Sequence, residues 1–292
     1  MEYIALRSGE KDWTTVAICR VLQVSEAGYY KYRRAKKKPY KYSDLLTIIY
    51  SILKEDEENV NYGVKRIFIA LKNQHSFKGS YSSIYRICKK NNLLIHYKRR
   101  PKGITKADSE AEKAENLIQQ DFTAEKPNEK WLTDITEIPC SDGKLYLAPI
   151  LDCYDGGILS FKMDTNMKAE LCVAAFEAAC QATSARGMIL HSDRGSQYTS
   201  SMFRKALANH GALQSMSGVG RCYDNARMES FFATLKKEKL YQMDTTKLTS
   251  NEVKTIVFRY IYYYNLRRIY STNFGWPPLV YRQFYYSKQK VA

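Results

Sequence analysis

An apolar run that ends in an aspartate, followed by a glutamate on a helical stretch, constrains the fold of this chain more than any other feature. The run MILHS leads into Asp193 and a glycine-containing turn, and the stretch DNARMESFFATLKKE carries Glu229. The 35 residues between them leave room for one helix, one short strand and a glycine loop. A third carboxylate, Asp134, lies upstream in the strand-like run KWLTDITEI. Because carboxylates from two strands and a helix can converge on one point, the pattern predicts a site for two divalent cations suited to phosphodiester chemistry.

The central part of the chain alternates strand and helix patterns. KWLTDITEI, KLYLAPILD and ILSFKMDT are β-rich runs separated by the turn sequences Ser141-Asp142-Gly143 and Asp155-Gly156-Gly157, so we expect three antiparallel neighbours. Helical and strand patterns then alternate up to a helix over residues 225–239. The order β-β-β-α-β-α-β-α predicts an α/β domain, a mixed sheet with helices on both faces.

Each acidic position also has an ordinary structural interpretation. Asp134 and Asp193 would serve as turn or helix caps, and Glu229 as a solvated helix residue. Asp134 shares its strand with apolar residues on both faces, where a carboxylate is costly unless it is paired or metal-bound. Lys236 lies on the helical face of Glu229 and would reach a phosphate, or be mere surface charge. Asp152 ends the second strand and is the alternative to Asp134 as first ligand, although a turn role suits it better.

The balance of charge predicts a polyanionic partner. The chain carries 46 Lys and Arg against 30 Asp and Glu, a formal net charge of +16. Residues 1–100 hold 21 of the basic residues and 9 of the acidic ones, so the excess belongs mainly to the N-terminal part.

Residues 13–34 predict a helix, a tight turn and a second helix that Ser25 opens as N-cap. This is the length of a helix-turn-helix, and its apolar frame is Val16, Leu22 and Val24. An ordinary helical hairpin with a basic tail explains the same residues. If the unit binds DNA, the side chains placed to contact phosphates are Lys31, Arg33 and Arg34.

A second helical unit follows over residues 39–100. Its apolar stripes have helical spacing and consist of Leu45, Ile48, Ile49, Ile52, Val64, Ile67, Phe68 and Leu71. The helix near YSSIYRICKKNN turns Ile84 and Ile87 inward, as a recognition helix would. A solvated basic face is the alternative, but two such units in tandem favour DNA contact, here through Arg86, Lys89 and Lys90.

Cysteine and hydropathy patterns exclude other classes. Seven cysteines without a C-x-x-C pair, and four histidines, argue against a disulfide framework and a structural zinc site, and favour a reduced cytoplasmic compartment. No apolar run is long enough for a membrane span. Thr249 and Glu252 predict a capping box that opens an aromatic helix in the tail, whose tyrosines would pack in the core or stack on bases or on a partner subunit. The predicted domain limits are 1–38, 39–100, 101–125 (linker), 126–240 (core) and 241–292 (tail).

Nearly the whole chain resembles the insertion-sequence transposases of family three, second-frame or OrfB type, whose core is similar to that of retroviral integrases. The resemblance extends to the 35-residue interval and both helical units. The matching residues are Trp131, Thr133, Asp134, Ile135, Thr136, Leu151, Asp152, His191 to Tyr198, Ser200, Ser217, Gly220, Asp224, Asn225, Ala226, Glu229, Ser230, Phe231, Phe232, Leu235, Lys236 and Glu238.

The resemblance implies a ribonuclease H-like core with Asp134, Asp193 and Glu229 as the acidic triad. It implies two Mg²⁺ ions, or Mn²⁺ in their place, and a reaction that cleaves element ends and transfers the freed 3′-hydroxyl strand. The expected partners are double-stranded DNA (terminal inverted repeats and target), further copies of the chain on that DNA, and an upstream-frame protein or fusion. We also expect Arg221, beside the Gly218–Gly220 loop, to contact DNA, and a nucleoid-associated location in a bacterium. The alternatives are a DNA-binding regulator with an inactive nuclease core, and a nuclease that cleaves without joining.

Overall fold

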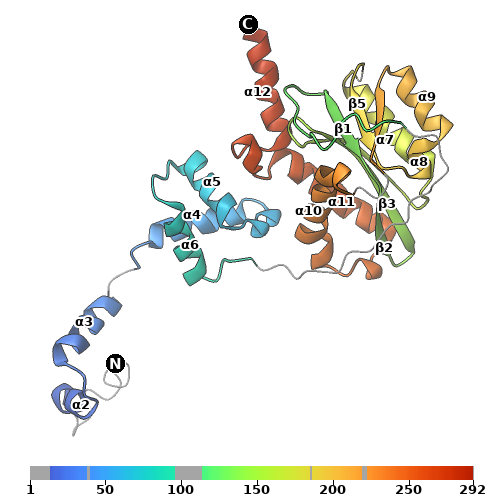
Figure 1. Ribbon diagram of the computed structural model, residues 1–292. Helices are drawn as coiled ribbons and strands as arrows, with labels where there is room; N and C mark the ends of the chain where they lie inside the picture. Colours follow the sequence, from blue (N-terminus) through green and yellow to red (C-terminus); the bar gives the residue numbers. More distant parts are fainter. Residues whose placement is uncertain (1–13, 38–39, 96–113, 185, 219–221, 292) are drawn as a thin grey trace. The chain divides into compact units, whose positions relative to one another are not determined.

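The computed structural model describes residues 14–37, 40–95, 114–184, 186–218 and 222–291 (Figure 1). The chain divides into two compact units, Met1–Ile52 and Leu53–Ala292. In the described part, none of the helices is long and apolar enough to cross a membrane. Most of the predicted linker lies outside the described residues, and the five predicted domain limits stay predictions.

The first unit contains two helices joined by a turn, as the sequence predicted. Helix α2 (Thr15–Val21) is capped by Thr14, and α3 (Glu26–Lys37) follows Ser25, whose hydroxyl accepts a hydrogen bond from Gly28 N at 3.1 Å, as an N-cap does. The predicted apolar frame was partly wrong, because Val16 and Leu22 are exposed. The buried residues are instead Ile18, Cys19 and Tyr29, with Val24 packed against them.

Helix α4 (Ser43–Lys54) runs across the boundary between the units, and the second unit continues with the 3₁₀ turn η1 (Glu57–Asn61), α5 (Val64–His75) and α6 (Tyr81–Lys90). The predicted inward positions are confirmed: Ile67, Leu71, Ile84 and Ile87 are at most 1% exposed. Ser80 caps α6, whose last turn is basic. The apolar stripes are buried because only one face of each helix can be removed from water in so small a unit.

Six strands form one mixed sheet: β1 (Lys130–Thr133), β2 (Thr136–Cys140), β3 (Gly143–Asp152), β4 (Ile158–Asp164), β5 (Ile189–Ser192) and β6 (Leu213–Met216). The order is β2-β3-β1-β5-β6, and β4 pairs with β3. The antiparallel pairings of β3 confirm the hairpin predictions, whereas β1–β5 and β5–β6 are parallel. KWLTDITEI was wrongly predicted as one strand, because it breaks at Asp134 and Ile135, where the Asp134 carboxylate hydrogen-bonds to the next backbone N–H.

Helices cover both faces of the sheet (Figure 1). On one face α7 (Ala169–Ala182), the short α8 (Ser196–Thr199) and α9 (Ser201–Asn209) pack on a core that contains Trp131, Ile150 and Phe176. The opposite face is covered by α10 (Ala226–Glu238) and α11 (Ser250–Leu266), which contact β1 and the β3–β4 hairpin respectively. Burial on both faces explains why the central strands are almost uniformly apolar.

The C-terminal segment folds back onto the core. Short turns η3 (Leu240–Gln242) and η4 (Thr245–Lys247) lead into α11, whose predicted capping box is confirmed, and η5 (Ser271–Asn273) precedes α12 (Pro278–Val291). Asn265 hydrogen-bonds both backbone groups of Ile158. Tyr260, Tyr263 and Tyr264 are buried, which favours the packing interpretation for them, while Tyr262 is exposed.

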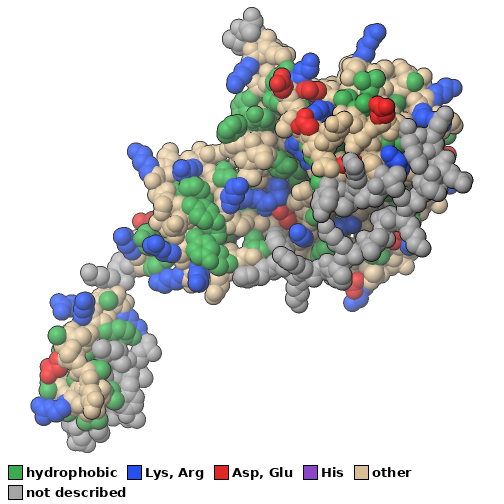
Figure 2. Space-filling model, viewed as in Figure 1, with side chains coloured by type: hydrophobic (Ala, Val, Ile, Leu, Met, Phe, Trp, Pro, Cys, Tyr) green, Lys and Arg blue, Asp and Glu red, His purple; other side chains and the backbone are tan. Residues whose placement is uncertain are grey.

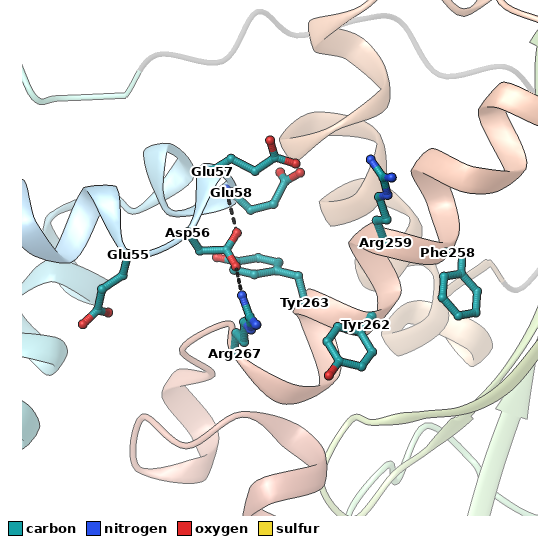
Figure 3. Close-up of a pocket in the computed structure, with 9 residues that line it drawn as sticks. All are labelled: Glu55, Asp56, Glu57, Glu58, Phe258, Arg259, Tyr262, Tyr263 and Arg267. Carbon is teal, nitrogen blue, oxygen red and sulfur yellow. Dashed lines mark hydrogen bonds and ion pairs between the residues drawn. The ribbon is translucent and has the colours of Figure 1, made fainter.

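A pocket of about 560 Å³ lies between residues 55–58 and α11 (Figure 3). Four consecutive carboxylates line one side of it, while Arg259 and Arg267 lie on the other. Asp56 pairs with Arg267 at 2.8 Å, and Tyr263 donates to the Asn59 side chain at 3.0 Å. These contacts join the segment that precedes α5 to the aromatic helix.

Candidate active site

Asp134 occupies the break between β1 and β2. Its Oδ1 accepts a hydrogen bond from Ile135 N at 2.8 Å, which leaves the second carboxylate oxygen for other partners. The preceding residue is held on two sides, because Thr133 O accepts from the Asn225 side chain at 3.1 Å and Thr133 Oγ1 lies 3.1 Å from the buried Tyr198 hydroxyl. These contacts fix the backbone from which the half-buried Asp134 side chain projects.

Asp193 follows the neighbouring strand. Strand β5 pairs in parallel with β1, with Leu132 opposite His191, so both aspartates lie two residues beyond a paired position. Because the carboxyl ends of parallel strands share one edge and adjacent strands are roughly 5 Å apart, the two carboxylates are neighbours. Asp193 Oδ1 accepts from Gly195 N at 3.0 Å, which explains the glycine-containing turn.

Glu229 lies in the first turn of α10, and its side chain is exposed. Helix α10 packs against β1, which brings its N-terminal turn to the same edge of the sheet. Lys236 lies two turns further along the same helical face and is half-buried. The positive end of the helix dipole favours a carboxylate in this first turn.

Electrostatics show that these side chains act on one another. Burial, then the charge of Asp193 and that of Glu229, raises the pKa of Asp134 to about 7, against the opposing hydrogen bond from Ile135 N and the charge of Lys236. Burial lowers the pKa of Lys236, and the nearby Asp134 carboxylate opposes this. Burial also raises the pKa of Asp193. The charges of Asp193, Glu229 and Lys236, the other three residues that the sequence pattern selected, therefore all act on Asp134.

The carboxylates do not form a closed cage. Within the described residue ranges, no three His, Cys, Asp or Glu side chains are grouped closely enough to hold a metal ion. Glu229 projects into solvent, while each aspartate has one oxygen committed to a backbone N–H. The result is an open, strongly acidic edge whose remaining oxygens are hard donors.

The alternative ligand, Asp152, serves a structural role instead. It is fully buried, accepts from Asn128 N and Tyr154 N, and forms an ion pair with Arg282 of α12 at 2.7 Å. Asp155 forms a second ion pair with the same guanidinium at 2.6 Å. His191 is buried between two serine hydroxyls, at 2.8 and 3.1 Å, which agrees with a packed, hydrogen-bonded role.

Two residues beside the site were not predicted as site residues, although both are among the residues that match the family. Asp224 is buried and accepts from Gly218 N at 2.7 Å and from the side chains of Asn116 and Gln120, both at 2.9 Å. Asn225 connects the start of α10 to Thr133 O. Polar Asp-Asn pairs before a helix usually suggest only an N-cap, so this long-range role had no local sequence signal.

The predicted DNA contacts are exposed as expected. Lys31, Arg33 and Arg34 are exposed on α3, and Arg86, Lys89 and Lys90 are exposed on α6. Exposure is necessary for phosphate contact but does not distinguish it from ordinary solvation. Arg221 lies outside the described residues.

The sheet order, with acidic residues at the ends of the two adjacent parallel strands β1 and β5 and on helix α10, defines an integrase-type catalytic core with the ribonuclease H-like fold. Residues 124–222 match the family described as "Integrase core domain", and residues 229–284 match a second family of that description. The chain is 32% identical over 269 residues to "Putative transposase InsK for insertion sequence element IS150" of Escherichia coli (strain K12), which covers 91% of this chain and 92% of the relative. It therefore belongs to the family of insertion-sequence transposases, and its function is that of a DNA transposase.

Other known proteins are also similar. "Transposase InsF for insertion sequence IS3A" of Escherichia coli (strain K12) is 29% identical over 268 residues, which is 89% of this chain and 91% of the relative. Among solved structures, the integrase catalytic core domain of HTLV-2 in complex with magnesium has a TM-score of 0.41 at 15% identity, covering 53% of this chain and 96% of that one. A simian T-cell lymphotropic virus intasome in complex with a PP2A regulatory subunit has a TM-score of 0.42 at 14% identity, covering 72% and 66%.

Proposed function

We propose that Asp134, Asp193 and Glu229 hold two divalent metal ions, Mg²⁺ being the natural choice, and that this site cleaves the ends of the element and joins the 3′-hydroxyl strand to target DNA. The observation that supports the proposal is that Asp134 and Asp193 follow adjacent parallel strands, while Glu229 lies on the helix that packs against the first of these strands. Mutual repulsion of three anions at one sheet edge is costly unless cations neutralise them.

The donor set fits such ions. Mg²⁺ prefers carboxylate and water oxygens and usually keeps several waters. Each aspartate has one oxygen fixed by a backbone N–H and a second that is not used in that bond, and Glu229 is exposed. An open acidic edge suits ions that also bind a substrate phosphate better than a closed cage would. When bound, a metal pair supplies activation of the attacking oxygen and stabilisation of the leaving oxygen.

The chain's own residues position the reacting groups. Asn225 and Tyr198 hold Thr133 in place, and through it the backbone next to Asp134. Lys236 places a cation on the face of α10 that carries Glu229, where it would contact a phosphate oxygen of the bound strand. Since none of these residues is required as a covalent nucleophile, the same arrangement serves both hydrolysis and strand transfer.

DNA recognition belongs to the helical units in this proposal. The exposed basic residues of α3 and α6 bind the terminal inverted repeats, and more than one copy of the chain assembles on the paired element ends. The excess of basic charge in residues 1–100 supports the assignment of DNA recognition to these helical units. An upstream-frame protein, either separate or fused to this chain, adds further contacts with the DNA.

Labelled element ends incubated with the chain and Mg²⁺ test the proposal. The wild type is expected to give nicked and joined products. Asp134→Asn is expected to give neither while DNA binding is retained, because the amide removes a metal-binding charge without changing side-chain size. Asp164→Asn is the matched control, since Asp164 also ends a strand but is exposed and caps only its own turn. Cleavage by Asp134→Asn refutes the ligand assignment, and binding without nicking by the wild type favours the regulator.

A further inference from the structure

A cationic site lies on a different face of α10 from Glu229 and Lys236. A pocket of about 210 Å³ is lined by α5, α10 and the segment that ends α11, and we name it the three-arginine pocket after Arg66, Arg227 and Arg268. Its other described lining residues include no carboxylate. Six of them carry hydroxyl groups, namely Ser230, Thr234, Tyr264, Tyr270, Ser271 and Thr272, and the remaining two are Phe231 and Ile269. Figure 2 shows Lys and Arg side chains gathered on the surface between α5 and α10.

The guanidinium groups are fixed before any ligand arrives. Glu238, at the end of α10, accepts from Arg268 Nε at 2.9 Å, from Arg268 Nη2 at 2.8 Å and from Arg66 Nη1 at 2.9 Å. The Tyr264 ring lies under the Arg268 guanidinium, 5.2 Å from centroid to Cζ. One carboxylate thus orients two arginines and neutralises one of their charges.

Arg227 contributes the remaining positive charge. Its Nη1 donates to Phe122 O at 2.9 Å, and no carboxylate in the described ranges lies within ion-pairing distance of it. The pocket therefore has a net charge of about +2 when Glu238 is included. Planar guanidinium donors combined with hydroxyl donors match the tetrahedral oxygens of a phosphate.

The pocket is separate from the carboxylate site. On α10, Arg227, Ser230 and Thr234 are rotated roughly 100–160° from the face of Glu229 and Lys236, because successive residues advance about 100°. A helix with side chains is about 10 Å across, so one strand can pass over α10 and place different phosphates on its two faces.

We propose that the three-arginine pocket binds a backbone phosphate of the DNA strand held on α10, at a position other than the scissile phosphate. This inference rests on the proposed function. It assigns Arg227 and Ser230 as anchoring residues that neither touch the reacting phosphate nor belong to the helix-turn-helix units. A free phosphate has the same chemistry, and the experiment distinguishes the two sources.

Anisotropy of a labelled duplex, measured over a series of salt concentrations without metal, tests the proposal. Arg227→Gln is expected to weaken binding about 10-fold and to reduce the slope of log affinity against log salt by about 1, the effect of losing one phosphate contact. Ser230→Asp, at an exposed helical position, places a carboxylate at the pocket and is expected to do the same without disturbing packing. Arg259→Gln is the control, because this arginine of α11 faces the carboxylates of residues 55–58 (Figure 3); we expect no change.

The outcomes separate the hypotheses. If Arg227→Gln and Ser230→Asp fold and retain the wild-type slope, the proposal is overturned. If inorganic phosphate raises the melting temperature of the wild type but not of Arg227→Gln, while the DNA slopes are equal, the pocket takes free phosphate and the DNA proposal is equally overturned. A wild type that does not nick DNA, but whose slope still falls with Arg227→Gln, refutes the proposed function and supports the pocket.

Discussion

Removing the charge of Glu238 is expected to cost the second unit about 3–5 kcal/mol of unfolding free energy, the range measured when one partner of a buried ion pair is deleted. Glu238 is 5% exposed and accepts four side-chain hydrogen bonds, from Arg66, Arg268 (two) and Tyr260, at 2.8–2.9 Å. In Glu238→Gln the 5% exposed Arg268 keeps its charge in a buried site without a counter-charge. The NH₂ group of the glutamine would also face the N–H and O–H donors of Arg66, Arg268 and Tyr260, with which it cannot form the same hydrogen bonds.

Urea unfolding of the full chain, followed by tryptophan fluorescence, measures this cost. Trp131 is fully buried in the sheet core and reports unfolding of the second unit. Glu137→Gln serves as the matched control, because it removes an ion pair with Lys144 in which the side chains are 45% and 60% exposed. Solvent screens such a pair, so its removal is expected to leave the unfolding midpoint unchanged.

A double variant separates charge from shape. Arg268→Met removes the buried guanidinium that Glu238→Gln leaves without a counter-charge. The double variant is therefore expected to lose less stability than the sum of the losses in the two single variants. A loss below about 1 kcal/mol in Glu238→Gln, or strict additivity in the double variant, would refute the argument that this carboxylate holds the buried arginine.

Three further results are expected. Burial would raise the pKa of Glu238, but the hydrogen bonds and charges of its arginines outweigh this and lower the pKa below the ordinary 4.5. The stability that the Glu238 charge contributes is therefore complete above pH 4.5 and is lost as the pH falls through the folded-state pKa. The difference in urea midpoint between the wild type and Glu238→Gln should accordingly narrow at acidic pH. Arg282→Met should cost about 3–5 kcal/mol, measured by urea unfolding, because Asp152 and Asp155 are left fully buried without their cation. Gly156→Ala should lower the melting temperature, because φ at this position is +76° and an added Cβ would lie 2.8 Å from the Tyr270 hydroxyl. An unchanged melting temperature would mean that the Tyr270 ring moves freely enough to accept the methyl group.

Local patterns predicted the elements that carry the site. The apolar run before Asp193 and the amphipathic stretch around Glu229 indicated β5 and α10 within a residue or two of their observed bounds. Such patterns succeed because a strand end, a turn glycine and an apolar helix face are written in neighbouring residues. The break at Asp134 was not predicted, because a carboxylate that accepts a hydrogen bond from the next backbone N–H does not change the alternation of apolar and polar residues along the strand.

Contacts between distant residues could not be predicted in this way. Arg282 meets Asp152 across 130 residues, and Arg66 meets Glu238 across 172. A charged residue on an amphipathic helix looks the same whether it faces solvent or a buried partner. The three-arginine pocket is built from such contacts, and for that reason no sequence motif indicated it.

The choice between Asp134 and Asp152 shows what the structure adds to an acidic motif. Both lie at strand ends on a largely buried sheet, and the sequence favoured Asp134 because the turn sequence beside Asp152 made a turn role better suited to Asp152. Asp152 has its charge neutralised by Arg282, so a metal ion would compete with an existing ion pair. Burial raises the pKa of Asp134, the charges of Asp193 and Glu229 raise it further, and Lys236 only partly opposes them. An ion pair neutralises Asp152, so this carboxylate stabilises the fold. Asp134 instead lies near other negative charges, a setting that favours a bound cation, and this difference supports Asp134 as the metal ligand.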